Sequence, residues 1–238
     1  MRKPILGAVA ASATLALAGG VAAGQTPEAT LKVTVSPKDA GTARNPKNTK
    51  LGFQMTVNKP KSTVQFIDLQ LPAGLKMSGK GFKRCPLATV ESNPAQCPAG
   101  SKAGPLGTAE AVLGATNQPL HFTVQSYVLT STTLAFYVSE STGLQVQAPL
   151  LGKITDAGRH LRIEIPFELR QPVGGLDASL TGLKQVFSGK RGSNYIVSSV
   201  GCRKKKHKFG AKLTFSARAD LAPVPPPLSA TASAPCTK

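Results

Sequence analysis

Apolar and polar residues alternate along most of the chain, with a period of two. In the segments 30–37 and 50–57 every second residue is apolar: Leu31, Val33 and Val35 in the first, and Leu51, Phe53, Met55 and Val57 in the second. Successive residues of a β-strand point to opposite sides, so this period predicts strands with one buried face. Similar patterns predict strands over 64–75, 107–114, 120–129, 133–139, 144–154, 160–169, 176–187, 194–200 and 207–217.

Short strands separated by turn residues predict an all-β fold, because no segment has a sustained helical period. The architecture that fits is an antiparallel β-sandwich, either immunoglobulin-like or extended. We expect a single domain over residues 24–238, since the first part of the chain alone supplies only about four good strands. The alternative is two small β domains divided near residues 114–117.

Residues 1–23 have the layout of a secretory signal peptide. Arg2 and Lys3 are positively charged, an uncharged apolar run extends from Ile5 to Leu17, and small residues suited to cleavage follow at 21–23. The apolar run is too short for a comfortable membrane span. We therefore expect an exported protein without a transmembrane segment, secreted or associated with the cell wall.

The chain has four cysteines: Cys85, Cys97, Cys202 and Cys236. In an oxidising compartment an even number of cysteines predicts disulfides, here two, with three possible pairings. The segment after Cys85 can turn back towards Cys97, because residues 86–93 suit one short helix that Asn93-Pro94 ends. We expect Cys85–Cys97, and therefore Cys202–Cys236.

The proline-rich segment 223–228 would run extended over the surface and bring Cys236 to Cys202. A zinc site is not expected, because zinc ligands come in closely spaced pairs and neither the cysteines nor His121, His160 and His207 do. We expect no metal and no cofactor.

The charge is strongly positive: 29 lysines and arginines stand against 11 acidic residues, giving a formal net charge of +18. Such a field attracts polyanions, here an anionic cell-wall polymer or polysaccharide. The densest run is Arg203, Lys204, Lys205, Lys206 and Lys208, which we expect at a hairpin tip held by a disulfide. The alternative is an ordinary solvated turn. A second cluster is Lys76, Lys80, Lys83 and Arg84.

Three stretches carry a resemblance: "LQLPAGLK" at 69–76, the cysteine-bounded loop followed by "CPAGSKAGPLGTA" at 97–109, and "VGCRKKKHKFGAKLTFSA" at 200–217 with a closing Pro-Cys. With the export signal, this order resembles a group of exported, disulfide-bonded β-sandwich proteins of high-GC Gram-positive (actinobacterial) soil bacteria. The resemblance covers most of the mature chain. It implies the fold, export and the two bridges, and no chemistry.

We expect no enzyme. Glu164 and Glu168 would share one face of a predicted strand, but such a pair is more often a solvated face than a glycosidase site. A carbohydrate-binding module or a hydrolase is the alternative; the module is disfavoured because the chain has no Trp and only three Tyr. Specific nucleic-acid binding is also disfavoured, because aromatics are not interleaved with the cations. A structural or interaction protein of the cell envelope remains.

Overall fold

A computed structural model describes residues 28–58, 62–114, 116–141, 146–174, 176–216 and 224–237. The expected signal peptide, residues 1–23, and the first residue of the proline-rich segment, Pro223, lie outside the described residues. Antiparallel strands dominate the described part, as the alternation predicts.

The strands are β1 (Glu28–Ser36), β2 (Lys47–Asn48), β3 (Lys50–Asn58), β4 (Val64–Gln70), β5 (Leu75–Met77), β6 (Gly107–Leu113), β7 (Pro119–Val128), β8 (Thr133–Glu140), β9 (Gln147–Thr155), β10 (His160–Glu164), β11 (Ala178–Phe187), β12 (Lys190–Arg191), β13 (Asn194–Tyr195), β14 (Val197–Ser199), β15 (Lys206–Phe215) and β16 (Leu228–Pro235). The helices are α1 (Leu87–Ser92) and α2 (Phe167–Arg170), with single 3-10 turns at Pro94–Gln96, Ala99–Ser101 and Asp156–Gly158.

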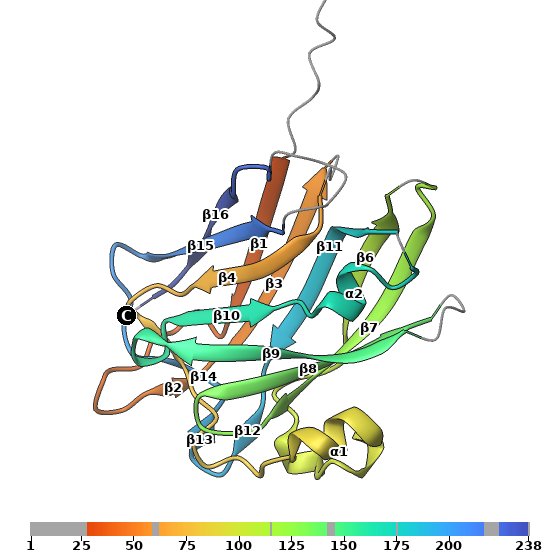
Figure 1. The fold of residues 1–238 in the computed structure, drawn as a ribbon. Coiled ribbons are helices and arrows are strands. Elements are labelled where there is room, and N and C mark those ends of the chain that lie inside the picture. Colours follow the sequence, from red (N-terminus) through yellow and green to blue (C-terminus); the bar gives the residue numbers. More distant parts are fainter. Residues whose placement is uncertain are drawn as a thin grey trace, which may run out of the picture.

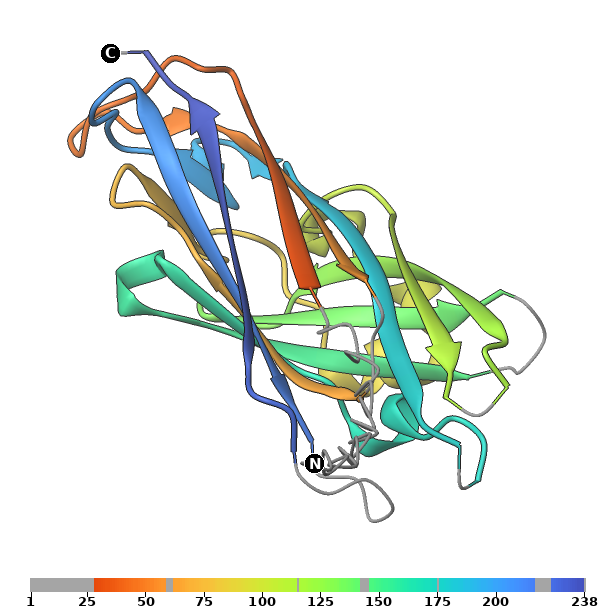
Figure 2. The same ribbon diagram turned by 90° about the horizontal axis from the view of Figure 1, so that it is seen from above.

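Eleven strands form one antiparallel sheet, in the order β1-β3-β11-β6-β7-β8-β9-β10-β4-β15-β16. The sheet bends round on itself, so that β15, β4, β10, β9 and β8 run across the front in Figure 1 while β1, β3 and β11 cross behind them. The two edge strands, β1 and β16, come to lie side by side (Figures 1 and 2). One continuous sheet with two facing layers corresponds to the extended type of sandwich.

The chain following β1 and the chain following β16 are joined by backbone hydrogen bonds. The Ala40 N–H donates to the Thr237 carbonyl, and the Thr237 N–H donates to the Lys38 carbonyl, each at 2.9 Å. Strands from both sides of residues 114–117 alternate in the same sheet, because β11 pairs with β3 and β10 pairs with β4.

The core fills the space between the layers with the apolar residues of the alternating pattern. On β3, Leu51, Phe53, Met55 and Val57 are all buried. Phe187 of β11 stacks on Phe53 with ring centroids 5.9 Å apart, and it meets Phe136 of the facing layer edge-on at 6.1 Å. Aromatic pairs at these distances add to the stabilisation from burial alone.

The loops lie at two opposite ends of the sandwich. We call the first the disulfide end; it comprises segments 37–49, 71–106, 129–132, 156–159, 188–205 and 236–237, which connect or follow strands there. It carries the small sheets β2-β14-β5 and β12-β13, together with α1, in the lower part of Figure 1. The α2 end comprises the described connections on the other side, including 165–174 and 176–177.

The structure corrects three of the expected elements. The strand predicted over 160–169 ends at Glu164, because Pro166 cannot donate a ladder hydrogen bond, and residues 167–170 form α2 instead. The segment after the prolines contains a strand, β16, that we did not expect. The basic run 203–208 is not a hairpin tip. Its first three residues lie in the connection from β14 to β15 and the others begin β15, and these two strands pair with other strands and not with each other.

Candidate functional site

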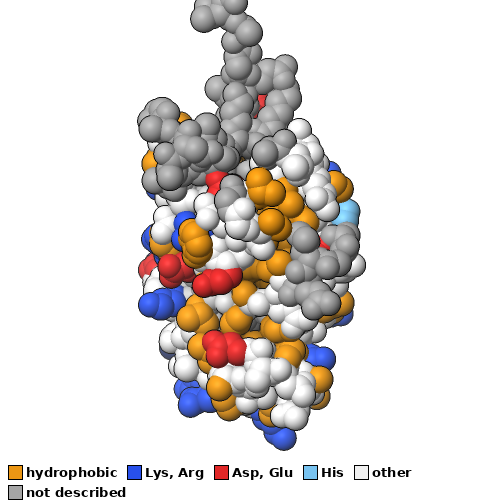
Figure 3. Space-filling view, turned by 45° about the vertical axis from the view of Figure 1, so that its right-hand side comes forward, with side chains coloured by type: hydrophobic (Ala, Val, Ile, Leu, Met, Phe, Trp, Pro, Cys, Tyr) orange, Lys and Arg blue, Asp and Glu red, His pale blue; other side chains and the backbone are white. Residues whose placement is uncertain are grey.

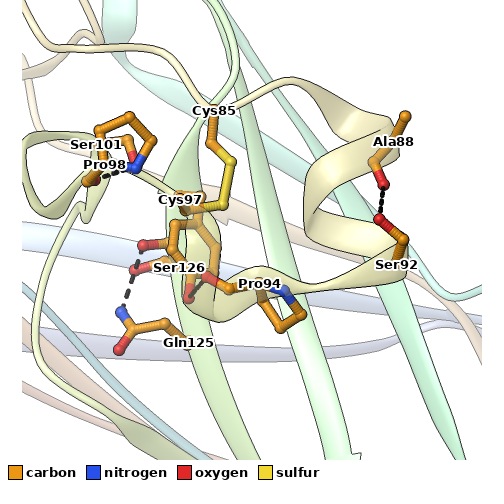
Figure 4. The surroundings of a disulfide bond; sticks show 10 residues. Cys85, Ala88, Ser92, Pro94, Cys97, Pro98, Ser101, Gln125 and Ser126 are labelled. Carbon is orange, nitrogen blue, oxygen red and sulfur yellow. Dashed lines mark hydrogen bonds between the residues drawn. A yellow bond between two sulfur atoms is a disulfide. The ribbon is translucent and has the colours of Figure 1, made fainter.

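Both expected disulfides are present, and both lie at the disulfide end. Cys85 bonds to Cys97 across the loop that contains α1, which confirms the expected short helix. Figure 4 shows this bond holding the helix and the following turn against the outer face of the sheet. The Cys85 N–H donates to the Val128 carbonyl at 3.0 Å, and the Tyr127 hydroxyl donates to the Pro94 carbonyl at 3.2 Å.

The packing of this loop makes a second, smaller apolar cluster outside the main core. Its buried members are Cys85, Val90, Cys97, Tyr127 and Ala135. Burial, with a smaller contribution from the neighbouring Tyr137, raises the pKa of the Tyr127 phenol. Tyr127 is thus a packing residue, and it is not an exposed platform on which a sugar ring would stack.

The second disulfide, Cys202–Cys236, anchors the basic turn. Arg203, Lys204 and Lys205 form the turn itself, with positive φ values of 54° at Lys204 and 57° at Lys205. The Lys206 N–H donates back to the Arg203 carbonyl at 3.3 Å. The Cys236 N–H donates to the Lys205 carbonyl at 3.0 Å, so the turn is tied to the end of β16 by a hydrogen bond as well as by the disulfide.

The other cations of the run lie on strand β15. Lys206 and Lys208 face outward and are exposed, whereas His207 between them points inward and is 2% exposed. Lys212 stands on the same outward face and extends the row. We did not include Lys212 in the predicted site, although the period of two that marks 207–217 as a strand would have placed it with Lys206 and Lys208.

Two shallow hollows follow this row over the outer surface. One, of about 350 Å³, is lined by Pro72 and Ala73 together with Arg203, Lys204, Lys206 and Lys208. The other, of about 430 Å³, lies over Gly210, where β15 has no side chain. Lys212, Gln70 and Thr231 are among its lining residues. Arg203, Lys204, Lys206, Lys208 and Lys212 therefore line two hollows along β15, and Lys205 is exposed on the turn beside them. We call Arg203, Lys204, Lys205, Lys206, Lys208 and Lys212 the basic strip.

None of the ion pairs found among the described residues includes a cation of the basic strip, although Asp68 lies opposite Lys212 across the β15–β4 pair and lines the same hollow. Those ion pairs are Arg159–Asp156, Arg162–Asp68 and the contact of His160 with Asp68. Neighbouring cations that line a hollow add their fields and focus them outward, which favours binding of an anion with repeated charges.

The disulfide end as a whole is basic. Besides the strip, it carries the following lysines and arginines: Lys38, Arg44, Lys47, Lys76, Lys80, Lys83, Arg84, Lys102, Arg159, Lys190 and Arg191. The acidic residues in its segments are Asp39, Glu91 and Asp156. The second predicted cluster, Lys76 to Arg84, thus lies at the same end as the basic turn, and β5 with Lys76 pairs directly with β14.

The described connections of the α2 end carry the opposite balance. Glu164 ends β10, Glu168 lies in α2, and Asp177 precedes β11, with Arg170 as the cation of the same segment. Glu164 and Glu168 do not share a strand face as predicted, because the chain turns at Pro166 between them. The two carboxylates are both exposed, and no acid–base pair on one strand remains.

One further polar group lies on the outer face beside the strip. The His160 Nε2 is 3.0 Å from Asp68 Oδ1, and the His160 Nδ1 is 3.0 Å from the Thr155 hydroxyl. Both ring nitrogens are therefore engaged, which fixes the imidazole between β4 and β9. Among the described residues no group of three or more His, Cys, Asp or Glu side chains is arranged to hold a metal ion.

No helix within the described ranges is long and apolar enough to cross a membrane. A scan of the chain against protein-family models gave no match, and searches of curated proteins and of solved structures gave none either. The resemblance to exported actinobacterial sandwich proteins therefore stays a prediction.

Proposed function

We propose that this protein is a secreted protein of the cell envelope that acts by binding and not by catalysis, and that the basic strip binds an anionic wall polymer or polysaccharide. The observation that carries the proposal is that the cations of the basic strip follow one another from the disulfide-anchored turn along the outward face of β15, where five of them line two hollows. The two disulfides are typical of proteins that fold outside the reducing cytoplasm and support the export part of the proposal.

The spacing within the strip suits a linear polymer. Alternate residues of a strand are about 6.6 Å apart, so Lys206 and Lys208 present charges at roughly the separation of successive anionic groups on an extended chain. A single surface ion pair contributes only about 0–1 kcal/mol. Several cations that engage one polymer act together, and they release the polymer's condensed counterions, so the affinity falls steeply with salt.

The test compares binding of the mature protein to dextran sulfate and to neutral dextran across a salt series. In the first variant Lys204→Asn, Lys205→Asn and Lys206→Thr are combined; asparagine tolerates the positive φ at 204 and 205, and threonine suits a strand. In the control variant Lys32→Thr, Lys50→Thr and Lys184→Thr remove three exposed lysines from the strands β1, β3 and β11.

The first variant should lose affinity for dextran sulfate by at least tenfold in low salt, and the slope of log K against log salt should fall by about 2–3. The control variant should keep most of the affinity, because none of its three lysines lines either hollow. Equal binding by the first variant and the wild type would show that the basic turn is only a solvated turn. Equal losses in both variants would show that net charge alone attracts the polymer.

A further inference from the structure

A small apolar cavity lies inside the sandwich, between its two layers, with a volume of about 70 Å³. Its lining residues on β11 are Ala178, Leu180, Leu183 and Gln185. Protein interiors rarely leave voids larger than a water molecule. This one has room for about five waters, yet apolar walls offer water few partners.

Small residues on one layer leave this space open. Ala109 and Ala111 on β6 and Ala178 on β11 point inward at positions where other strands place Leu, Ile or Phe. Opposite them the facing layer supplies Phe136, Leu150 and Ile163. The cavity is therefore a consequence of three alanines in an otherwise well-filled core.

The cavity reaches the α2 end, where one cation borders it. Arg170, the last residue of α2, is half-buried and lines the cavity. Its Nε–H is buried and has no hydrogen-bond partner among the described residues. A buried guanidinium N–H without an acceptor is costly, and an anionic oxygen would satisfy it with a strong, charge-assisted hydrogen bond.

The rim of the cavity next to Arg170 is apolar. Phe167, the first residue of α2, is 57% exposed, and its ring centroid lies 5.7 Å from the Arg170 guanidinium carbon. This side of the molecule comes forward in Figure 3, where apolar side chains form a band down the middle of the face and acidic ones stand beside it. An amphiphile would meet apolar surface before it enters.

We propose that the cavity binds a fatty acid, with an unbranched alkyl chain between the layers and the carboxylate on Arg170. A small apolar space suits a short alkyl chain, which can bend to follow it, and a methylene group is about the size of a water molecule. The cavity then accepts roughly five to seven methylenes. This site lies apart from the basic strip, so the inference is independent of polymer binding.

The first test is calorimetric titration of the mature protein with straight-chain acids from butanoate to dodecanoate, below their micellar concentrations. The affinity should rise by about fourfold per added methylene and level off near octanoate, when the cavity is full. An affinity that keeps rising through dodecanoate indicates adsorption to the surface, and the absence of binding by every acid indicates an empty structural void. Either outcome overturns the proposal.

The second test uses variants. Ala111→Leu should fill the cavity and reduce octanoate binding by at least tenfold, whereas Ala88→Leu, on the exposed face of α1, should leave it unchanged. If Ala111→Leu does not fold, Arg170→Gln decides: it should weaken octanoate by roughly tenfold or more and leave octanol unaffected. Equal effects on the acid and the alcohol, or none on either, would contradict the assignment of the carboxylate to Arg170. Binding of dextran sulfate by these variants should remain as in the wild type.

Discussion

His207 illustrates at the residue scale how a strand divides a run of like residues. Its neighbours Lys206 and Lys208 are exposed, while its own ring is buried beside Phe209, with ring centroids 6.4 Å apart. The His207 Nε2 is buried without a hydrogen-bond partner in the described part of the chain. Burial lowers the pKa of the His207 imidazole, because the charged form loses its hydration.

The lowered pKa predicts a loss of stability in acid. The folded protein keeps His207 neutral, while the unfolded chain binds a proton once the pH falls below about 6.5. The stability from this residue is therefore complete above that pH and declines below it. Between pH 7 and pH 5 the wild type should lose more of its unfolding free energy than His207→Leu does, measured by urea unfolding.

At the scale of single elements, strands with large apolar residues could be predicted from the sequence, whereas a strand with small apolar residues could not. The strands β3 and β15 alternate Phe, Leu and Met or Ala with polar residues, and both were expected. Strand β16 also alternates, but its inward positions are Ala230, Ala232 and Ala234, which the sequence pattern alone does not distinguish from a small-residue tail. It forms because β15, which pairs with β4 on one side, has its other edge available, and β16 pairs with that edge along Lys206–Leu213.

Pairings between distant strands were also beyond the sequence. The succession β6-β7-β8-β9-β10 consists of neighbours in the chain, which short turns connect. The insertion of β11 between β3 and β6, and of β4 between β10 and β15, depends on the fit of side chains across the whole core. For the same reason the sequence identified the cations of the basic turn but not the hollows, the polar neighbours from β4 and β16, or the cavity between the layers.

The two disulfides should contribute to stability by similar amounts and differ in their effect on binding. Cys85→Ala with Cys97→Ala opens a bridge with a sequence separation of 12 and should cost about 3 kcal/mol in unfolding free energy; Cys202→Ala with Cys236→Ala opens one with a separation of 34 and should cost about 4 kcal/mol. Urea unfolding measures both.

Only the second pair releases the basic turn, so only that variant should bind dextran sulfate more weakly in low salt. Weaker binding by the first pair alone would place the contact on the α1 loop.

The concentration of cations at the disulfide end has a consequence for the whole molecule. Like charges on neighbouring loops repel one another in the folded state, and unfolding relieves part of that repulsion by separating them. Salt shortens the range of the repulsion from about 30 Å at 0.01 M to about 10 Å at 0.1 M. Added salt should therefore stabilise this protein, whereas a protein held by surface ion pairs would lose stability.

Screening that contributes about 1 kcal/mol would raise the melting temperature by about 2–4 °C for a chain of this length. We expect such a rise between 0.01 M and 0.1 M NaCl, measured by circular dichroism during heating. The spectrum of the folded protein, before heating, should be strand-dominated. The variant that combines Lys204→Asn, Lys205→Asn and Lys206→Thr removes three of the crowded cations, so its melting temperature should start higher in low salt and respond less. The control variant with Lys32→Thr, Lys50→Thr and Lys184→Thr should respond more nearly as the wild type does, because Lys32 and Lys184 lie within strands and only Lys50 borders a loop of the disulfide end. A melting temperature that falls with salt in the wild type would mean that attraction between unlike charges outweighs repulsion at the disulfide end.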